Sequence, residues 1–126
     1  MHRVLVVSFV ALVAVLSLAA PAAAKSQTVS VKLTPDGCPK PITVKPGSVT
    51  FKVANDGADN VSEFEVMKGS KILGEVENIA PGLSRTFKMN LKAGDYVTYC
   101  PGGDTREKGV LTVAAVVKST TVTTAG

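Results

Sequence analysis

Histidine is almost missing from this chain of 126 residues, which contains only His2. His2 and Arg3 precede an almost uninterrupted apolar run, Val4 to Ala20, and Pro21-Ala22-Ala23-Ala24 follows it. A short charged region, an apolar region and an A-x-A site in this order are typical of a secretory signal peptide. We therefore expect residues 1–24 to be removed by cleavage after Ala24. The mature chain would then contain no histidine.

A chain without histidine excludes several kinds of site. Ser-His-Asp and Cys-His catalysis need an imidazole base, and histidine zinc sites and blue-copper sites need imidazole ligands. Any metal site must therefore use thiolate, carboxylate, thioether or backbone ligands.

Aromatic side chains and long apolar runs are also scarce. Aromatic residues make up 5% of the chain, tryptophan is absent, and the lysines are scattered singly. A nucleic-acid surface usually has clustered basic residues, so we expect no nucleic-acid partner. After the leader, no apolar stretch approaches the roughly 20 residues that a membrane helix needs. We therefore expect a periplasmic or secreted protein without membrane insertion after signal cleavage.

Alternating apolar and polar residues continue from Thr28 to Val113, and no window has helical periodicity. Short strands separated by Pro and Gly turns predict an all-β fold, a Greek-key β-sandwich of seven or eight strands. We expect this domain to span residues 25–117, and the Ser/Thr-rich tail 118–126 to be disordered. The expected strands are Val29 to Leu33, Ile42 to Lys45, Val49 to Ala54, Val61 to Met67, Ile72 to Glu77, Arg85 to Leu91, Tyr96 to Cys100 and Val110 to Ala114. The expected core includes Phe51, Phe64, Val66, Val76, Phe87, Tyr96 and Val110.

Cys38 and Cys100 are the only cysteines. In an exported protein two cysteines favour a disulfide, which would stabilise the fold by about 4 kcal/mol. Reduced thiolates would instead be soft metal ligands. Either alternative requires the two residues to lie close together, with Cα atoms within about 7 Å.

Four glutamates have a spacing that suggests a second ligand set. Glu63 and Glu65 are two residues apart on one expected strand, and Glu75 and Glu77 are two apart on the next. Each pair therefore projects from one face of its strand. A three-residue turn over Gly69, Ser70 and Lys71 would pair Phe64 with Val76, Glu63 with Glu77 and Glu65 with Glu75. Like charges placed opposite one another either turn into water or share a cation.

Two longer segments resemble the cupredoxin family. Residues 44–55, Val-Lys-Pro-Gly-Ser-Val-Thr-Phe-Lys-Val-Ala-Asn, resemble a turn and strand of that family, and residues 91–102 resemble the strand that delivers its copper cysteine. Blue-copper members follow that cysteine with a histidine and usually a methionine. Here Pro101-Gly102-Gly103-Asp104 follows, so we do not expect an ordinary blue-copper electron carrier.

Within the cupredoxins the chain is most similar to the EfeO type, the N-terminal domain of the periplasmic component of a bacterial iron-uptake system. The resemblance covers about Val29 to Val113 and rests on Glu63 to Gly69, on Glu75 to Ser84 and on the two cysteines. It implies a domain that binds copper or iron through cysteines and glutamates, and a ferroxidase-like activity. The implied metal ligands are Cys38, Glu63, Glu65, Glu75, Glu77 and Cys100. The implied partners are a metal ion and an iron-uptake membrane protein or helical peptidase-like protein.

Two functional hypotheses follow. The first is an exported metal-binding module for iron or copper. The alternative is a disulfide-stapled β-sandwich that binds a protein partner without a metal. Asn60-Val61-Ser62 also fits a glycosylation sequon, a triplet that occurs often by chance.

Overall fold

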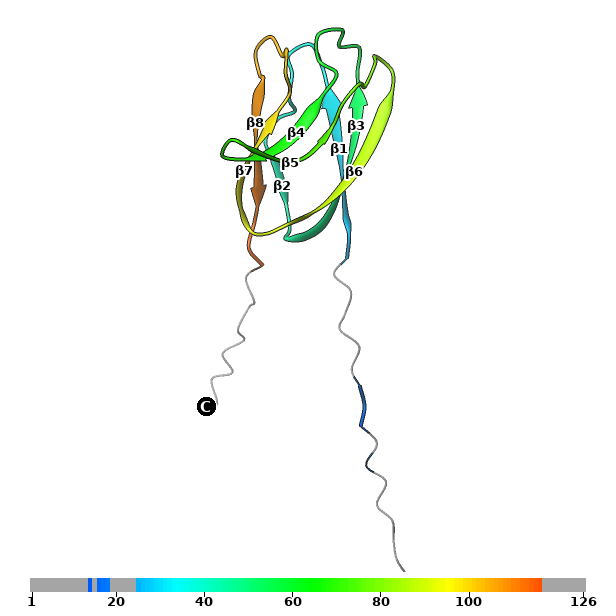
Figure 1. Ribbon diagram of the computed structural model, residues 1–126, viewed down its shortest axis with the longest axis vertical. Helices are drawn as coiled ribbons and strands as arrows, with labels where there is room; N and C mark the ends of the chain where they lie inside the picture. Colours follow the sequence, from blue (N-terminus) through cyan, green and yellow to red (C-terminus); the bar gives the residue numbers. More distant parts are fainter. Residues whose placement is uncertain (1–13, 15, 19–24, 117–126) are drawn as a thin grey trace, which may run out of the picture.

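The computed structural model describes residues 14, 16–18 and 25–116, and residues 27–113 contain the strands of one β-domain (Figure 1). The expected signal peptide, apart from residues 14 and 16–18, and the expected tail 118–126 lie outside the described residues. No helix in the described part of the chain is long and apolar enough to cross a membrane. The strands are β1 (Gln27–Leu33), β2 (Ile42–Val44), β3 (Gly47–Asn55), β4 (Phe64–Lys68), β5 (Lys71–Val76), β6 (Ser84–Leu91), β7 (Gly94–Tyr99) and β8 (Lys108–Val113).

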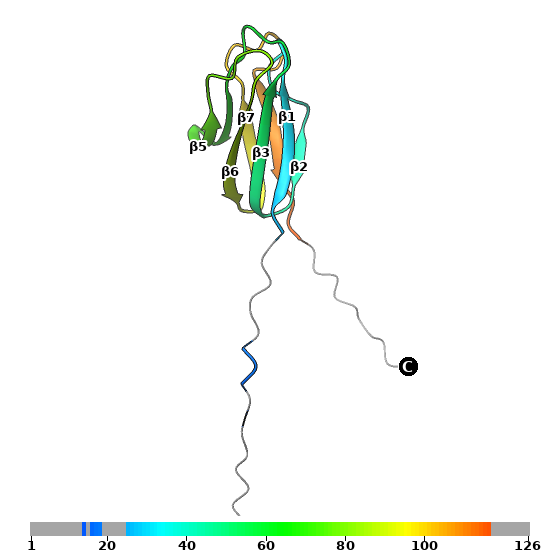
Figure 2. The same cartoon turned by 90° about the vertical axis from the view of Figure 1, so that its right-hand side faces the viewer.

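The strands form two sheets that face each other (Figure 2). The smaller sheet has the order β1-β3-β6, and the larger has the order β2-β8-β7-β4-β5. Most neighbouring strands are antiparallel, but β1 pairs with β3 and β2 pairs with β8 in parallel. The all-β sandwich of eight strands is therefore confirmed.

The core lies between the sheets and is built from one face of each strand. Phe51, Phe64 and Phe87 are packed together at centroid distances of 5.1 to 6.2 Å, and Phe51 and Phe64 are fully buried. Of the other expected core residues, Val66 and Tyr96 are buried, while Val76 and Phe87 pack against the core as partly buried residues.

The expectation for Val110 is wrong, because this side chain is 50% exposed. The neighbouring Leu111 is fully buried instead and lies opposite Tyr96 across β7 and β8. Strand alternation allows either of two adjacent apolar residues to point inward. Pairing with a buried residue on the next strand decides which one does.

The hairpin of β4 and β5 has the expected pairing but a different turn. Phe64 pairs with Val76 and Glu65 pairs with Glu75, as predicted. Near the turn, however, Lys68 pairs with Lys71, so the connection has two residues, Gly69 and Ser70, rather than three. A β-bulge between Val66 and Met67 supplies the missing residue, because it leaves Leu73 unpaired on β5. The bulge therefore sets the register that the longer turn was expected to set.

We call the end of the sandwich that holds the segments 34–41, 56–63, 77–83 and 100–107 the loop end (Figure 1). Two asparagines hold it together. The buried Asn55 amide nitrogen lies within 3.0 Å of the carbonyl oxygens of Ala58, Val61 and Ile79. The Asn60 amide donates to the carbonyl oxygens of Pro35 and Gly102, at 2.9 and 2.7 Å. These bonds fix the loops around the ends of β3, β4 and β7.

Candidate metal centre

The four glutamates singled out in the sequence gather on the outer side of the hairpin of β4 and β5. We call them the glutamate face. Glu63, Glu75 and Glu77 each offer a carboxylate oxygen, and these oxygens all lie within 4.8 Å of one another. Glu65 is not one of these three, but it pairs directly with Glu75 and forms a side-chain hydrogen bond with Glu63. The expected convergence of the two pairs is therefore present.

Backbone contacts next to the strands bring Glu63 and Glu77 together, although neither residue belongs to a strand. The Ile79 N–H donates to the Ser62 carbonyl oxygen at 3.0 Å, which ties the chain after β5 to the chain before β4. Between Glu77 and Ile79, Asn78 adopts a positive φ of 56°, a conformation that asparagine tolerates better than most residues. This local reversal lets Ile79 enter the core while Glu77 stays exposed.

Glu65 is the unusual member of the group. Its side chain points to the outer face, yet the residue is only 6% exposed, because β4 lies inside the sheet between β7 and β5. The pKa of Glu65 is raised from 4.5 to about 7, first by burial and then by the hydrogen bond to Glu63 and the charges of Glu63, Glu75 and Glu77. The side chain therefore binds a proton close to neutrality when no cation is present.

The glutamate face lacks a close positive partner. Among the described residues, no lysine or arginine nitrogen lies within 4.0 Å of these carboxylates. A positively charged residue, Arg85 of β6, lines a hollow of about 290 Å³ together with Glu75, Glu77 and Asn78. The negative charge of the face is thus left without a neutralising contact inside the domain.

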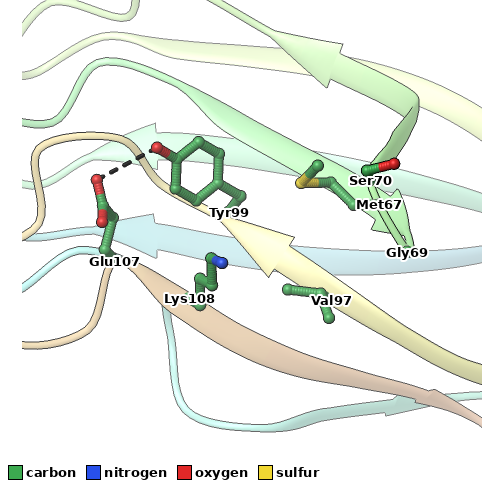
Figure 3. A pocket seen from close by; sticks show the side chains of 7 residues that line it. All are labelled: Met67, Gly69, Ser70, Val97, Tyr99, Glu107 and Lys108. Atoms are coloured by element: carbon green, nitrogen blue, oxygen red, sulfur yellow. Dashed lines mark hydrogen bonds between the residues drawn. The ribbon is translucent and has the colours of Figure 1, made fainter.

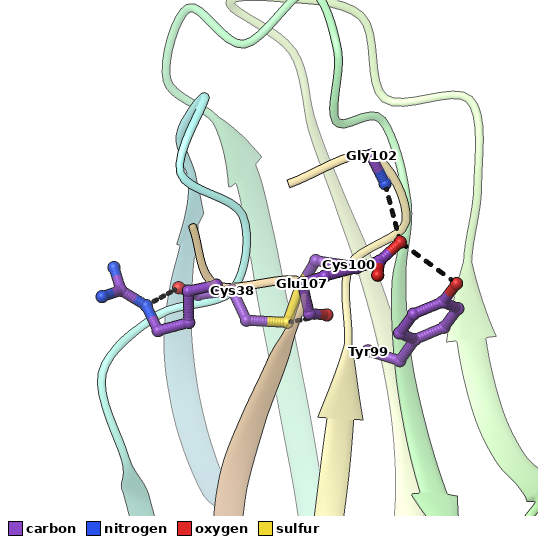
Figure 4. Close-up of a disulfide and its surroundings, with 6 residues drawn as sticks. Cys38, Tyr99, Cys100, Gly102 and Glu107 are labelled. Carbon is purple, nitrogen blue, oxygen red and sulfur yellow. Dashed lines mark hydrogen bonds between the residues drawn. A yellow bond between two sulfur atoms is a disulfide. The ribbon is translucent and has the colours of Figure 1, made fainter. Parts of the chain in front are cut away.

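The two cysteines do not contribute thiolate ligands. Cys38 and Cys100 form a disulfide with Cα atoms 5.3 Å apart, and both residues are buried (Figure 4). The Cys38 N–H donates to the Arg106 carbonyl oxygen, and the Cys100 N–H donates to that of Glu107. The predicted proximity is confirmed, and the open alternative is resolved in favour of the bridge. A bridged sulfur is not a thiolate ligand.

Sequence reasoning missed Tyr99 and Glu107, which extend the polar surface beyond the four glutamates. Tyr99 pairs with Glu65 across β4 and β7, and its hydroxyl lies 3.3 Å from Glu107 Oε1 (Figure 4). The charge of Glu107 raises the pKa of Tyr99, and burial and the hydrogen bond to Glu107 add to this effect. The position of Tyr99 three residues after Tyr96, on the opposite face of β7, was the only available signal.

Beside Tyr99 the outer face of the larger sheet forms a shallow hollow of about 500 Å³ (Figure 3). Met67 and Val97 form its apolar part, and Tyr99, Glu107 and Lys108 provide polar groups. Met67 and Val97 also belong to a row of apolar residues that runs across four strands. The row consists of Ile72, Met67, Val97 and Val110, each paired with the next.

The side chains present suit a site for a hard cation better than they suit a blue-copper site. A blue-copper centre uses two imidazoles, a thiolate and a weak axial ligand. In the described residues there is no histidine, and the cysteine at the end of β7 is bridged. The blue-copper ligand set therefore does not fit. Carboxylate oxygens at the observed separation could serve as hard oxygen ligands to a cation.

Comparison with known proteins agrees with this architecture and with the iron-related resemblance. Over 92 residues the chain is 39% identical to "Iron uptake system component EfeO" of Escherichia coli K12 and, equally, of Shigella flexneri. The matched part covers 72% of this chain but only 24% of those relatives. The chain thus spans about a quarter of the length of these curated relatives.

Solved structures with the same fold include copper proteins of low sequence identity. Auracyanin B matches with a TM-score of 0.60 at 16% identity, over 70% of this chain and 88% of that one. Rusticyanin from Thiobacillus ferrooxidans matches with a TM-score of 0.58 at 15% identity, over 72% and 79%. These identities establish the fold alone. The cupredoxin-like domain family matches residues 6–113. The chain therefore belongs to the cupredoxin-like domain family and, within it, resembles the domain of EfeO.

Proposed function

We propose that this protein is an exported metal-binding module of an iron-uptake system and that it binds iron or copper ions at the glutamate face. The observation that carries the proposal is the convergence of the Glu63, Glu75 and Glu77 carboxylates to within 4.8 Å. The buried and unneutralised Glu65 beside them supports it independently. A bound cation would relieve the repulsion among these groups.

A bound cation would lower the electrostatic energy of the four carboxylates. Directly opposed like charges, such as Glu65 and Glu75, destabilise a sheet. A polyvalent cation turns this repulsion into attraction and makes the ionised form of Glu65 favourable. Ferric iron and Cu(II) accept oxygen ligands, and the name of the curated relatives points to iron. The cargo would arrive from the compartment to which the expected signal peptide directs the chain.

The test is calorimetric titration of the chain beginning at Lys25 with Fe(II) under anaerobic conditions, and with Fe(III) and Cu(II). We expect one saturable site tighter than about 100 μM, equivalent to roughly −5.5 kcal/mol. Glu63→Gln/Glu75→Gln should weaken binding at least tenfold. Asp56→Asn/Asp59→Asn removes two exposed acids from the loop end and serves as the matched control. Equal binding by both double variants would contradict a site at the glutamate face.

The same titration with Fe(II) in air tests the ferroxidase-like activity that the resemblance implies. Oxidation would transfer one electron from each ferrous ion to dioxygen, and the absorbance of the ferric product reports it. Catalysis requires that wild type oxidises Fe(II) faster than Glu63→Gln/Glu75→Gln does.

A second candidate function is a protein-binding module, and one observation favours it. The apolar row across β5, β4, β7 and β8 leaves Ile72 44% and Val110 50% exposed. Exposed apolar rows beside a hollow are a common feature of interaction surfaces. If no metal gives a saturable site, this function replaces the first, with the disulfide as a purely structural bridge.

A further inference from the structure

The two sheets of the sandwich differ in charge. The strands of the smaller sheet, β1, β3 and β6, contain three lysines and one arginine but no aspartate or glutamate. The larger sheet carries Glu65 on β4, Glu75 on β5 and Asp95 on β7. Because the outer faces of the two sheets point away from each other across the core, the domain has a basic side and an acidic side.

The outer face of the smaller sheet is almost entirely polar, and we call it the lysine face. In these strands the residues that pack inward, such as Val31 and Val53, alternate with residues that point outward. Lys32, Lys52 and Lys88 point outward and are exposed. Six hydroxyl side chains surround them, namely Thr28, Ser30, Ser48, Thr50, Ser84 and Thr86.

The three lysines form one diagonal line across the sheet. Lys52 lies on the central strand β3, between β1 and β6, and it pairs with Ser30 and Thr86 (Figure 2). Lys32 is two residues beyond Ser30 on β1, and Lys88 is two residues beyond Thr86 on β6, in the opposite direction along the sheet. Standard strand spacing and rise place the Cα atoms of neighbouring lysines about 8 Å apart. The result is an evenly spaced line of positive charge.

These charges have no neutralising partner within the sheet. In the described part of the chain, Lys68 is the lysine whose ammonium donates a hydrogen bond, to the Asp95 carbonyl oxygen at 2.6 Å. Acidic residues occur only beyond the ends of β1, β3 and β6, and the one closest in sequence is Asp56, directly after Asn55. The lysine face therefore complements a negatively charged partner.

The composition of the face restricts the kind of partner. Ala54 is its only apolar residue, whereas bilayer insertion and protein interfaces both need apolar contact area. Arg85 pairs with the buried Val53 and belongs to the opposite side of β6, so the face has neither arginine nor aromatic residues for contacts with nucleic-acid bases. The two hollows described above lie outside this face, so a compact small ligand has no cavity here.

We propose that the lysine face binds a linear anionic polysaccharide. The lysines would pair with successive carboxylate or sulfate groups of the polymer, and this releases its counterions. The flanking serine and threonine hydroxyls would exchange hydrogen bonds with sugar hydroxyls, which an acidic polypeptide lacks. This proposal is independent of metal binding, because the glutamate face lies on the other sheet and both faces can be occupied at once.

The test measures binding of the chain beginning at Lys25 to immobilised polymers in a buffer without divalent cations. Residues 25–116 contain all eight strands, the described core and the disulfide. Polygalacturonate supplies carboxylates, dextran sulfate supplies sulfate groups, and neutral dextran is the control. We expect at least about tenfold tighter binding to a charged polymer than to dextran at about 0.05 M salt, weakening as salt increases. The preferred charged polymer identifies the anionic group.

Three variants locate the surface. Lys32→Gln/Lys52→Gln/Lys88→Gln should weaken binding roughly tenfold and reduce its salt dependence. Lys45→Gln/Lys71→Gln/Lys92→Gln removes the same charge from exposed positions outside the lysine face and should lose less than about threefold. Ser30→Ala/Thr86→Ala, beside Lys52, should weaken binding to the polysaccharide but not to poly-glutamate. The melting temperature of each variant checks that the domain is folded.

The proposal is overturned if neither charged polysaccharide binds more tightly than neutral dextran. Equal losses in the two lysine variants would also overturn it, because net charge rather than the lysine face would then determine binding. Poly-glutamate or single-stranded DNA that binds as tightly as the polysaccharide would show that the face does not select a sugar polymer.

Discussion

At the loop end, Cys38 and Cys100 are buried and covalently joined, whereas on the outer face of the larger sheet four glutamates lie together without a counter-charge. In the first region the backbone N–H groups of both cysteines have hydrogen-bond acceptors, so this region needs no ligand. The second is left with repulsion that a cation could relieve. Under the proposed function, structural stability and ligand binding would therefore depend on separate sets of side chains.

Removal of the disulfide tests the structural side of this comparison and should have the largest effect. In Cys38→Ala/Cys100→Ala we expect the free energy of unfolding to fall by about 4 kcal/mol, because the bridge closes a loop with a sequence separation of 62. Urea denaturation measures this change. Below the new melting temperature, metal affinity should stay within a few-fold of wild type. Loss of the metal site in a still folded variant would show that the two regions are not separate.

The pH dependence of the free energy of unfolding, to which Glu65 contributes, tests the glutamate face. Its pKa is raised from 4.5 to about 7, so folding favours the protonated form. The resulting stabilisation is complete below about pH 4.5 and is lost as the pH rises through about 7, with a total of about 3 kcal/mol. Glu65→Gln cannot ionise and should therefore be more stable than wild type at pH 8 without metal.

Urea denaturation of both proteins at pH 5 and pH 8 measures this difference. Glu107→Gln, which removes a carboxylate from the other side of Tyr99, is the control. A wild type and Glu65→Gln variant with parallel pH profiles would show that Glu65 is not the group that titrates near neutrality. Metal added at pH 8 should stabilise wild type more than Glu65→Gln.

A smaller effect is expected at Arg85, which shares a hollow with Glu75 and Glu77 but forms no ion pair within 4.0 Å among the described residues. Its positive charge competes with a bound cation through partly screened Coulomb forces. Arg85→Gln should therefore bind the metal ion two- to fivefold more tightly, or about 0.5 to 1 kcal/mol. Arg85→Lys keeps the charge and should match wild type in calorimetry. Weaker binding by Arg85→Gln would indicate that Arg85 positions a glutamate.

The sequence predicted the sandwich and the pairing of Phe64 with Val76, because alternation and the apolar face restrict both strongly. The bulge at Leu73 was not predictable, since a longer turn gives the same pairing. The choice between Val110 and Leu111 depends on a partner strand, β7, that local patterning does not identify. Tyr99 was also not predictable from local patterning. Its position next to Glu65 arises from the pairing of β4 with β7, and the two residues are more than 30 positions apart in the sequence. The oxidation state of the cysteines was left open, as spacing alone does not determine it.

The hydrogen bonds of Asn60 have a consequence for production of the protein in eukaryotic cells. The same amide nitrogen that donates to the Pro35 and Gly102 carbonyl oxygens would have to be the acceptor of a glycan in the sequon Asn60-Val61-Ser62. In the folded domain this nitrogen is occupied, so sugar transfer has to precede folding. A transferred glycan would then keep the segments around Pro35 and Gly102 apart. Secretory expression in yeast or mammalian hosts therefore sets glycosylation and loop closure in competition, and Asn60→Asp would not resolve it, since a carboxylate cannot donate these bonds.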